Sequence, residues 1–276
     1  MSDLNYLEAV VLGVVEGLTE FLPVSSTGHL TIAEKMLGLQ IDDPAITAYT
    51  AVIQMGAIGA VLVYFIKDIW AITKAWFKGL VRPEYRGTFD HRMGWFVIAG
   101  SIPIGVIGFV GKDVISGPLR SLWWVAGALI AWSAVMWLAE TRGTQERGEK
   151  ELTLTDAIVV GLTQCIALVP GVSRSGATIS AGLLRGLDRV TATRLSFFLS
   201  IPALTAAGLY ELKDVHGIGI GPTLVGTAVS FAVAYAAVAW LLRFVAGHPI
   251  TWFIPYRLVL GFGIIALLAA GTISAT

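Results

Sequence analysis

The sequence predicts an all-α polytopic membrane protein with about six transmembrane helices and two further, broken helical regions. Hydrophobic residues make up 55% of the 276-residue chain and charged residues only 14%, whereas an ordinary soluble domain carries roughly 25% charged residues. Several uncharged runs also approach the ~20 residues that cross the hydrocarbon core of a bilayer. The bilayer is therefore the expected solvent of this chain.

Six segments are predicted to cross the membrane in full, namely residues 47–66, 93–111, 121–139, 190–210, 222–242 and 256–274. Two further apolar regions, 4–38 and 156–187, are each interrupted by a polar cluster that contains proline and glycine. Their flanks are too short to cross comfortably. Non-helical backbone at membrane depth is tolerated only against protein or a wet cavity. We therefore expect two re-entrant helix pairs.

The two interrupted regions resemble each other. A shift of 148 positions places Gly13 on Gly161, Glu16 on Gln164, Val24 on Val172, Ser25 on Ser173 and Gly28 on Gly176. Each region precedes three spans, so a single membrane domain, 1–276, divides into halves of the same plan, 1–140 and 141–276. An odd number of spans per half requires the second half to insert upside down. The sequence thus predicts an inverted-topology repeat with broken helices.

Charge in the connections predicts the orientation. Segment 67–92 carries six Lys and Arg residues against three Asp and Glu residues. Basic connections favour the cytoplasmic side, so both termini and the entry of the first break are expected on the outside. The net charge is zero and no basic face stands out, which argues against binding to nucleic acid.

Glu16 and Glu20 lie four residues apart in an apolar helical segment, and hence on one face. Carboxylates at membrane depth are costly unless they face a cavity, a cation or a basic partner. Their oxygens suit Mg²⁺ or Ca²⁺ held together with phosphate oxygens. The alternative is an interfacial helix whose acidic face touches water.

The first break, PVSSTGH at 23–29, places Ser25, Ser26 and Thr27 where a new helix would begin. Such residues are natural helix caps, and capping alone could explain them. His29 lies three residues after Ser26, so a hydroxyl and an imidazole could meet on one helix face. That pairing allows a base to activate a nucleophile. It equally allows His29 to act as a general acid or as the nucleophile itself.

The second break, PGVSRSGAT at 170–178, predicts an anion site. Ser173 and Ser175 flank Arg174 at the start of a helix, where free N–H groups and the dipole attract phosphate. Arg174 adds a planar, permanently charged fork. The alternative is that Arg174 only pairs with Glu16 or Glu20 to close a buried charge network.

Together the breaks suit phosphoryl transfer from a lipid diphosphate. The main alternative is a transporter or flippase for a phosphorylated lipid or anion, because inverted repeats with broken helices are common among transporters. A third class, a structural subunit, would not need so many ionisable groups at membrane depth. Catalysis through a hydroxyl would require Ser26, whereas transport could survive Ser26→Ala.

The motifs that contain these residues resemble those of a known family. GVVEGLTEFLPVSSTGH (13–29) and ALVPGVSRSGATIS (167–180) resemble the two signature motifs of the undecaprenyl-diphosphate phosphatase family, the bacitracin-resistance type. The similarity extends to VIQMGAI (52–58) and IPYR (254–257). The resemblance implies a bacterial inner-membrane enzyme that recycles the carrier lipid of peptidoglycan synthesis. Such an enzyme would convert the C55 diphosphate to the monophosphate with a divalent cation, at a site open to the periplasm.

The resemblance also assigns roles to residues. It implies Ser26 as the favoured nucleophile and His29 as its acid or base partner, with Glu20 and Arg174 also catalytic, although a His29 nucleophile and direct attack by water stay open. Glu16 and Glu20 would hold the cation. Phosphate would be bound by Ser25, Thr27, Ser173, Arg174, Ser175, Gly176 and Thr178.

Other polar and small residues are expected to be structural. His91 is expected to be exposed in a connection and Arg257 to lie at the membrane interface. Gly100, Gly105 and Gly108 permit close helix packing, either within the chain or in a homodimer.

Overall fold

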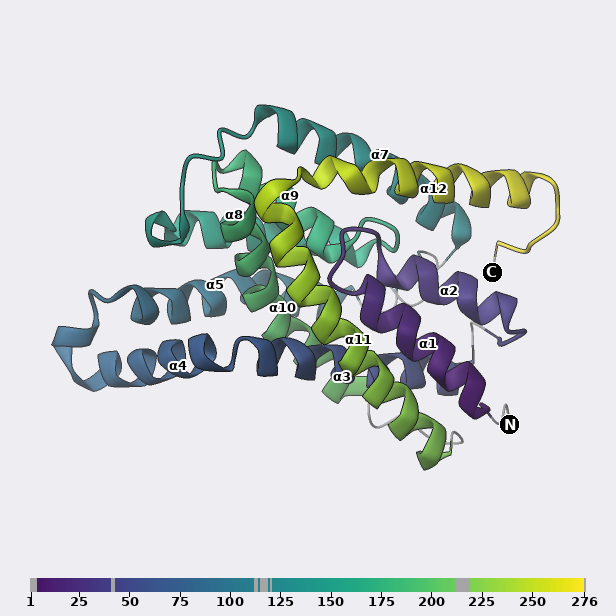
Figure 1. Cartoon of the computed structure of the whole chain (residues 1–276), viewed down its shortest axis with the longest axis horizontal. Coiled ribbons are helices and arrows are strands. Elements are labelled where there is room, and N and C mark those ends of the chain that lie inside the picture. The colour runs from purple at the N-terminus through teal and green to yellow at the C-terminus, as the bar shows by residue number, and fades with distance from the viewer. Residues whose placement is uncertain are drawn as a thin grey trace.

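The computed structural model describes residues 4–40, 43–111, 114, 119, 121–211 and 219–275. These residues form eleven α-helices (Figure 1). The first half contributes α1 (Tyr6–Thr19), α2 (Ser26–Met36), α3 (Pro44–Tyr64), α4 (Ile66–Val81), α5 (Phe89–Val110) and α7 (Leu122–Arg142). The second contributes α8 (Leu154–Gln164), α9 (Arg174–Leu184), α10 (Arg189–Glu211), α11 (Ile220–Gly247) and α12 (Ile254–Ala269). The predicted all-α class is confirmed.

Six of these helices are long and apolar enough to cross a membrane, as predicted. They are Ala45–Tyr64, Phe89–Val110, Leu122–Arg142, Arg189–Tyr210, Ile220–Gly247 and Ile250–Ala269. Large apolar side chains on them face outward, including Phe109 and Val259, whose exposed fractions are 77% and 74%. Because exposed apolar surface of this extent would be costly in water, lipid is the solvent of these faces.

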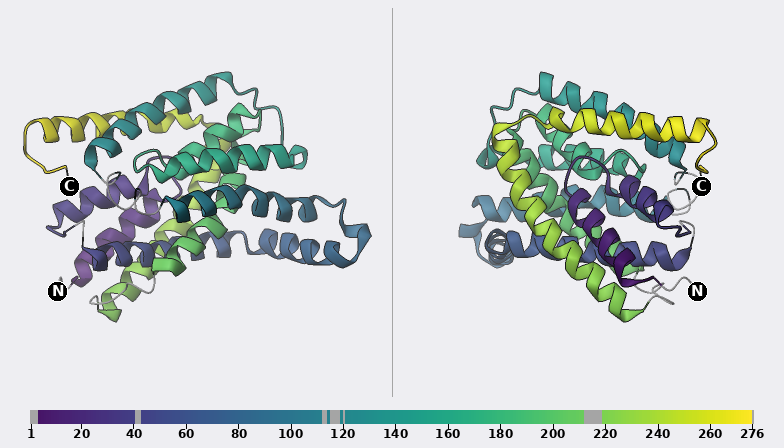
Figure 2. Two further views of the ribbon diagram at one scale, coloured as in Figure 1. Left: turned by 180° about the vertical axis from the view of Figure 1, so that it is seen from behind. Right: turned by 45° about the vertical axis from the view of Figure 1, so that its right-hand side comes forward.

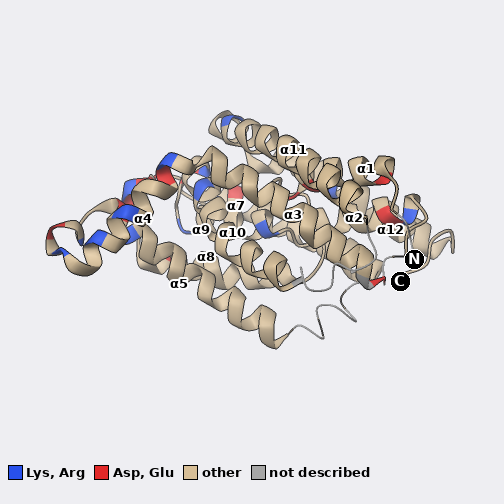
Figure 3. Cartoon of the chain, turned by 90° about the horizontal axis from the view of Figure 1, so that it is seen from below, with Lys and Arg blue, Asp and Glu red and all other residues tan. Residues whose placement is uncertain are grey.

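The connection 67–92 contains a helix that the sequence analysis did not predict. α4 continues from α3 after Phe65 and packs antiparallel against the start of α5, so that the two project together from one end of the molecule (Figures 1 and 2). Lys and Arg residues gather along α4, as Figure 3 shows in blue. The basic residues indicated a loop, but Ile69, Ile72 and Trp76 recur at helical spacing and pack inward beside them.

Four short helices, α1, α2, α8 and α9, hold the two interrupted regions. α1 packs along α11, and α8 packs along α5. Glycine makes both approaches close: a Cβ on Gly17 of α1 would lie 2.5 Å from the carbonyl oxygen of Ser230, and Gly161 of α8 lies against Gly100 of α5. Small residues at such crossings let helix backbones meet. α7 and α12 pair along the side of the molecule beside these short helices (Figure 1).

Aromatic packing anchors the end of α1. The ring of Phe21, which is fully buried, lies edge-on to Phe197 of α10 at 5.4 Å between centroids. Phe65 and Phe198 continue the cluster at 5.1 Å. Since Phe21 follows Glu20 directly, this packing fixes where the acidic face of α1 ends.

Candidate active site

Two breaks in the helical chain, residues 20–25 and 169–173, form the centre of the candidate site. In each, the helix that follows begins directly after a serine with positive φ: Ser25 precedes α2 and Ser173 precedes α9, both with φ of 76°. A residue with a Cβ adopts this conformation at a cost of about 1–3 kcal/mol, and such strain persists where the surroundings enforce it. Ser25 and Ser173 are also the two serines that coincide when the sequence is shifted by 148 positions.

Hydrogen bonds tie the two breaks to each other. The backbone N–H of Gly171 donates to Ser25 Oγ at 3.2 Å, and the Ser175 hydroxyl donates to the carbonyl of Leu22 at 2.9 Å. Ser25 and Ser175 are both buried. Segments about 150 residues apart in the sequence therefore meet in one place, and the N-termini of α2 and α9 both begin there.

Glu20 lies between the two breaks. One carboxylate oxygen, Oε2, accepts from the Ser26 hydroxyl at 2.5 Å, and the other, Oε1, accepts from Arg174 Nη2 at 3.1 Å. The side chains of Arg174 and Glu20 are only 10% and 4% exposed. In such a low-dielectric setting an ion pair and a short hydrogen bond are strong. The structure thus brings the predicted acid, hydroxyl and guanidinium into direct contact.

Two of the charged groups keep unused hydrogen-bonding capacity. Within the described residues, neither carboxylate oxygen of the fully buried Glu16 has a hydrogen-bond partner, and neither do Nε and Nη1 of Arg174. Glu16 lies close enough to Glu20 and Arg174 for their charges to act on it, and the Gln54 side chain lies beside its carboxylate. Buried polar atoms are rarely left unpaired, so each such group calls for an explanation. The carboxylate oxygens of Glu16 are suited to bind a cation, and the free N–H groups of Arg174 are suited to bind an anion.

His29 lies beside this centre but does not pair with Ser26. Its Nδ1 lies 2.7 Å from the carbonyl of Ser25, and its Nε2 lies 2.5 Å from the hydroxyl of Tyr256 on α12, whose ring stacks on the imidazole. Because a carbonyl only accepts, Nδ1 carries the proton, and Nε2 of the neutral ring accepts from Tyr256. Ser26 donates to Glu20 instead, so the hydroxyl–imidazole contact expected from the i, i+3 spacing is not made in this conformation.

The remaining predicted residues support the breaks. Ser173 Oγ caps α9 by accepting from the N–H of Gly176 at 3.2 Å, and it lies 3.1 Å from Ser175 Oγ. The Thr178 hydroxyl lies 2.6 Å from that of Ser196 on α10. Thr27 is exposed at the start of α2. The role of these residues in phosphate binding stays a prediction.

Two expectations about histidine and arginine were wrong. His91 is buried at 7% exposure, where it accepts from Trp95 Nε1 at 3.3 Å, because α4 packs over the start of α5. Arg257 is fully buried rather than interfacial, and it contacts both breaks. Arg257 and Tyr256 were missed as site residues, although an ionisable residue inside a predicted span is itself a functional signal.

Comparison with known proteins decides the family. The model of the family described as bacitracin resistance protein BacA matches residues 9–263. The chain belongs to the BacA family. Undecaprenyl-diphosphatase 3 of Frankia casuarinae is 58% identical over 278 residues, which cover 99% of this chain and 100% of that protein. Undecaprenyl-diphosphatase of Acidothermus cellulolyticus is 54% identical over 275 residues, and that of Mycolicibacterium smegmatis is 50% identical over 279, each covering 99% of this chain.

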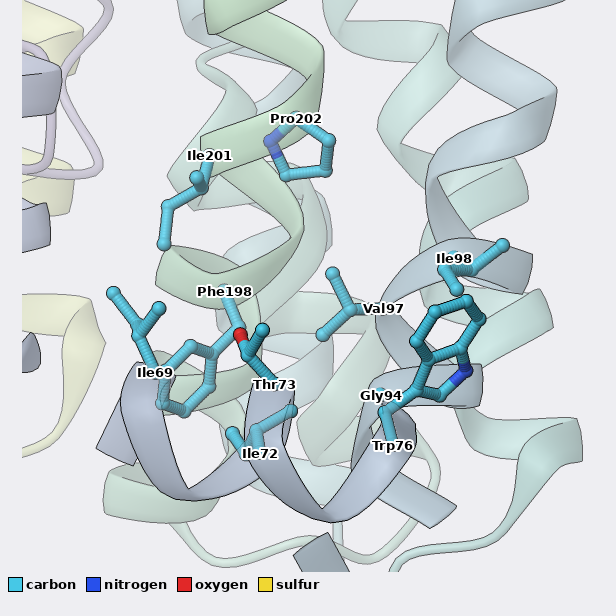
Figure 4. A pocket seen from close by; sticks show the side chains of 10 residues that line it. All are labelled: Ile69, Ile72, Thr73, Trp76, Gly94, Val97, Ile98, Phe198, Ile201 and Pro202. Atoms are coloured by element: carbon cyan, nitrogen blue, oxygen red, sulfur yellow. The ribbon is translucent and has the colours of Figure 1, made fainter. Parts of the chain in front are cut away.

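Two apolar grooves of this BacA-family chain have no charged residue in their lining. One, of about 270 Å³, lies between α4, α5 and α10 and is lined by Ile69, Trp76, Val97 and Phe198 among others (Figure 4). None of its lining residues carries a charge. The chemistry of the molecule is therefore concentrated at the two breaks rather than in this groove.

Proposed function

We propose that this chain hydrolyses undecaprenyl diphosphate to undecaprenyl phosphate and inorganic phosphate, and so recycles the carrier lipid of peptidoglycan synthesis and confers resistance to bacitracin. The observation that carries the proposal is the contact of Glu20 with both Ser26 and Arg174. It joins a general base, a hydroxyl and an anion-binding group inside a membrane protein. The printed names of the full-length relatives agree with this activity.

In the proposed first step, Ser26 Oγ attacks the terminal phosphorus and its proton passes to Glu20. The bond between that phosphorus and the bridging oxygen breaks, undecaprenyl phosphate leaves with the electron pair, and Glu20 returns the proton to the leaving oxygen. Water then attacks the phosphorus of the phosphoserine and gives a proton to Glu20. The bond between phosphorus and Ser26 Oγ breaks with its electron pair on Oγ, which regains the proton from Glu20, and inorganic phosphate is released. A base and a nucleophile in hydrogen-bond contact are the usual arrangement for such covalent catalysis.

Arg174 has a double role in this proposal. Before substrate binds, it pairs with Glu20. The free Nε and Nη1 groups of Arg174 point to a phosphate as the missing partner. Phosphate oxygens that bind the guanidinium would then compete with Glu20 for Arg174, which places the bound phosphate beside Ser26 and its base.

A divalent cation is part of the proposal. The carboxylate of Glu16 fits this group, because it is fully buried, no donor among the described residues lies at hydrogen-bond geometry to either oxygen, and only the Gln54 side chain lies beside it. The described residues contain no cluster of three or more acidic, His or Cys side chains, so Glu16 and Glu20 would hold the ion together with phosphate oxygens. A bound Mg²⁺ or Ca²⁺ would neutralise charge on the diphosphate.

We also propose that α1–α2 and α8–α9 are re-entrant pairs of an inverted repeat. The matched serines with positive φ support this, as does the packing of α1 on α11 and of α8 on α5, which are equivalent pairs under the repeat. With the basic connection 67–92 in the cytoplasm of a bacterial inner membrane, the site would open to the periplasm. The proposal includes a homodimer, since Gly105 faces open space within the described chain.

The experiment that tests the proposed function is the release of phosphate from undecaprenyl diphosphate by purified protein in detergent. We expect cation-dependent release that Arg174→Ala lowers by about 10²–10³-fold, as for the loss of one charge-stabilising donor. Arg243→Ala, which changes an exposed arginine on α11, is the matched control and should leave release unchanged. If folded wild type with Mg²⁺ or Ca²⁺ releases no phosphate, the proposal is wrong. Movement of the lipid across proteoliposomes would then test the transporter alternative.

A further inference from the structure

Arg257 is a buried positive charge without a carboxylate partner in the described part of the chain. It lies in the first turn of α12 and is 0% exposed, and it takes part in none of the ion pairs formed by the described residues. A guanidinium buried in this way is costly unless its N–H groups are fully used. The position of the side chain therefore has to be explained by what it binds.

Five oxygens of the protein surround the guanidinium. Nη1 donates to the carbonyl of Pro23 at 2.9 Å, and Nη2 lies 3.1 Å from the carbonyls of both Gly171 and Val172. The other two oxygens belong to α7: the Ser133 hydroxyl, 3.2 Å from Nε, and the Leu129 carbonyl, 3.3 Å from Nη2. Three of the five acceptors are thus backbone carbonyls of the two breaks.

These carbonyls need an external partner. Where a helix is interrupted, the carbonyls of its last turn and of the break have no intrahelical donor, and at membrane depth no bulk water replaces it. Pro23 and Gly171 lie in the breaks between α1 and α2 and between α8 and α9. The planar fork of Arg257 supplies donors to both breaks at once, which the point charge of a lysine does not match.

The carbonyls lie next to the reacting groups. Pro23 is three residues from Ser26 and three from Glu20, and Val172 is two residues from Arg174. Arg257 is fully buried and five protein oxygens surround its guanidinium, so its place is behind the reacting groups. We propose that Arg257 is a positioning residue that holds the two breaks at a fixed separation, so that Ser26 and Glu20 on one meet Arg174 on the other. This inference rests on the proposed function for its effect on turnover.

The test compares Arg257→Met and Arg257→Lys with Arg194→Met in the phosphate-release assay. Arg194 pairs with Asp68 and Glu149 and lies over the rings of Phe65 and Phe198, but it makes no hydrogen bond to either break, so its loss reports what removal of a partly buried, paired arginine does to stability. We expect Arg257→Met to lower kcat by about a hundredfold, as for a misplacement near 1 Å, with a far smaller change in KM. Arg257→Lys should fall between wild type and Arg257→Met, and Arg194→Met should keep the wild-type kcat.

A second readout does not depend on activity. In a Cys165→Ser background, spin labels at Met36 and Leu184, which are exposed at the ends of α2 and α9, report the separation of the helices that follow the breaks. The distance distribution should broaden in both Arg257 variants and stay unchanged in Arg194→Met. Should Arg257→Met fail to fold, Arg257→Lys carries the test.

Two results would overturn the inference: a folded Arg257 variant with wild-type kcat, or one with a wild-type distance distribution. Inactive wild type would instead contradict the proposed function, and the label distances would still decide the role of Arg257.

Discussion

At the scale of single residues, Glu20 is the point where both breaks meet. Its two oxygens bind Ser26 from one break and Arg174 from the other. These two contacts place the proposed base next to both the proposed nucleophile and the proposed phosphate-binding group.

Tyr256 and His29 are expected to act as a unit. Tyr256→Phe removes the hydroxyl that lies 2.5 Å from His29 Nε2 while keeping the stacked ring. If the tyrosine acts only through the imidazole, the double variant His29→Ala with Tyr256→Phe should be no less active than His29→Ala alone. The measurement is a double-mutant cycle on kcat. Additive losses would show that Tyr256 acts independently of His29.

Glu16→Gln is expected to weaken the dependence on a divalent cation. The variant keeps the shape of the side chain but replaces the carboxylate whose two oxygens have no partner among the described residues. The cation concentration for half-maximal phosphate release should rise by about tenfold or more, in line with the loss of a group that supports metal binding. Gln164→Leu, at the equivalent position of the second half, is the control. An unchanged cation dependence in Glu16→Gln would remove this residue from the cation site.

The sequence predicted the residues of the breaks because they are adjacent in short motifs. It did not predict Tyr256, whose contact with His29 spans 227 positions, and it paired Ser26 with His29 from helical spacing alone. Both residues do lie in α2 at that spacing, but the Ser25 carbonyl and the Tyr256 hydroxyl bind the two ring nitrogens of His29. Ser26 donates to Glu20 instead, a contact that periodicity could not predict.

At the scale of helices, the acidic face of α1 is positioned by close packing against α11. Gly13 and Gly17 lie on the side of α1 that touches α11, and a Cβ on either would lie 2.5 Å from a carbonyl oxygen there. Hydropathy predicted the six spans but did not predict α4. The apolar residues of α4 recur at helical spacing, but the lysines among them led to the prediction of a basic loop.

Gly17→Ala is expected to destabilise the protein and to lower activity. The added methyl would meet Ser230, Val233 and Ala234, and overpacking of this kind costs about 1–3 kcal/mol. Gly127→Ala on α7 is the control, because nothing lies within 4 Å of its Cβ position and alanine is the better helix former. Thermal unfolding in detergent should show a lower Tm for Gly17→Ala and an unchanged or higher Tm for Gly127→Ala. Equal values would contradict the close crossing.

At the scale of the whole molecule, an ionic network joins three segments of the second half: the connection after α7, the start of α8 and the end of α9. Asp156, in the first turn of α8 and outside the six spans, binds Arg147 of the connection at 2.6 Å and Arg185 at 2.8 Å. Burial alone would raise the pKa of Asp156, but hydrogen bonds from Arg147, Thr153 and Arg185 outweigh it and hold the pKa well below its usual range.

This network predicts a dependence of stability on pH. A carboxyl whose pKa is lowered by folding stabilises the protein above its unfolded-state pKa of about 3.9, and this contribution is lost as the pH falls toward the folded-state value. Between pH 7 and about 4 the Asp156 contribution should be fully present, and below that range it should decline. Asp156→Asn should have a lower Tm at pH 7, and its difference from wild type should shrink at acid pH. A difference that stayed constant with pH would contradict the ionic role.

The most direct measurement of the central claim is phosphate release from undecaprenyl diphosphate by Ser26→Ala and Glu20→Gln, each compared with wild type. If Ser26 is the nucleophile and Glu20 its base, both folded variants should lose kcat by at least about a hundredfold, while KM changes little. The double variant should be no worse than the poorer single one, because the two groups act as a unit. Turnover near the wild-type rate in folded Ser26→Ala would contradict this account of the site.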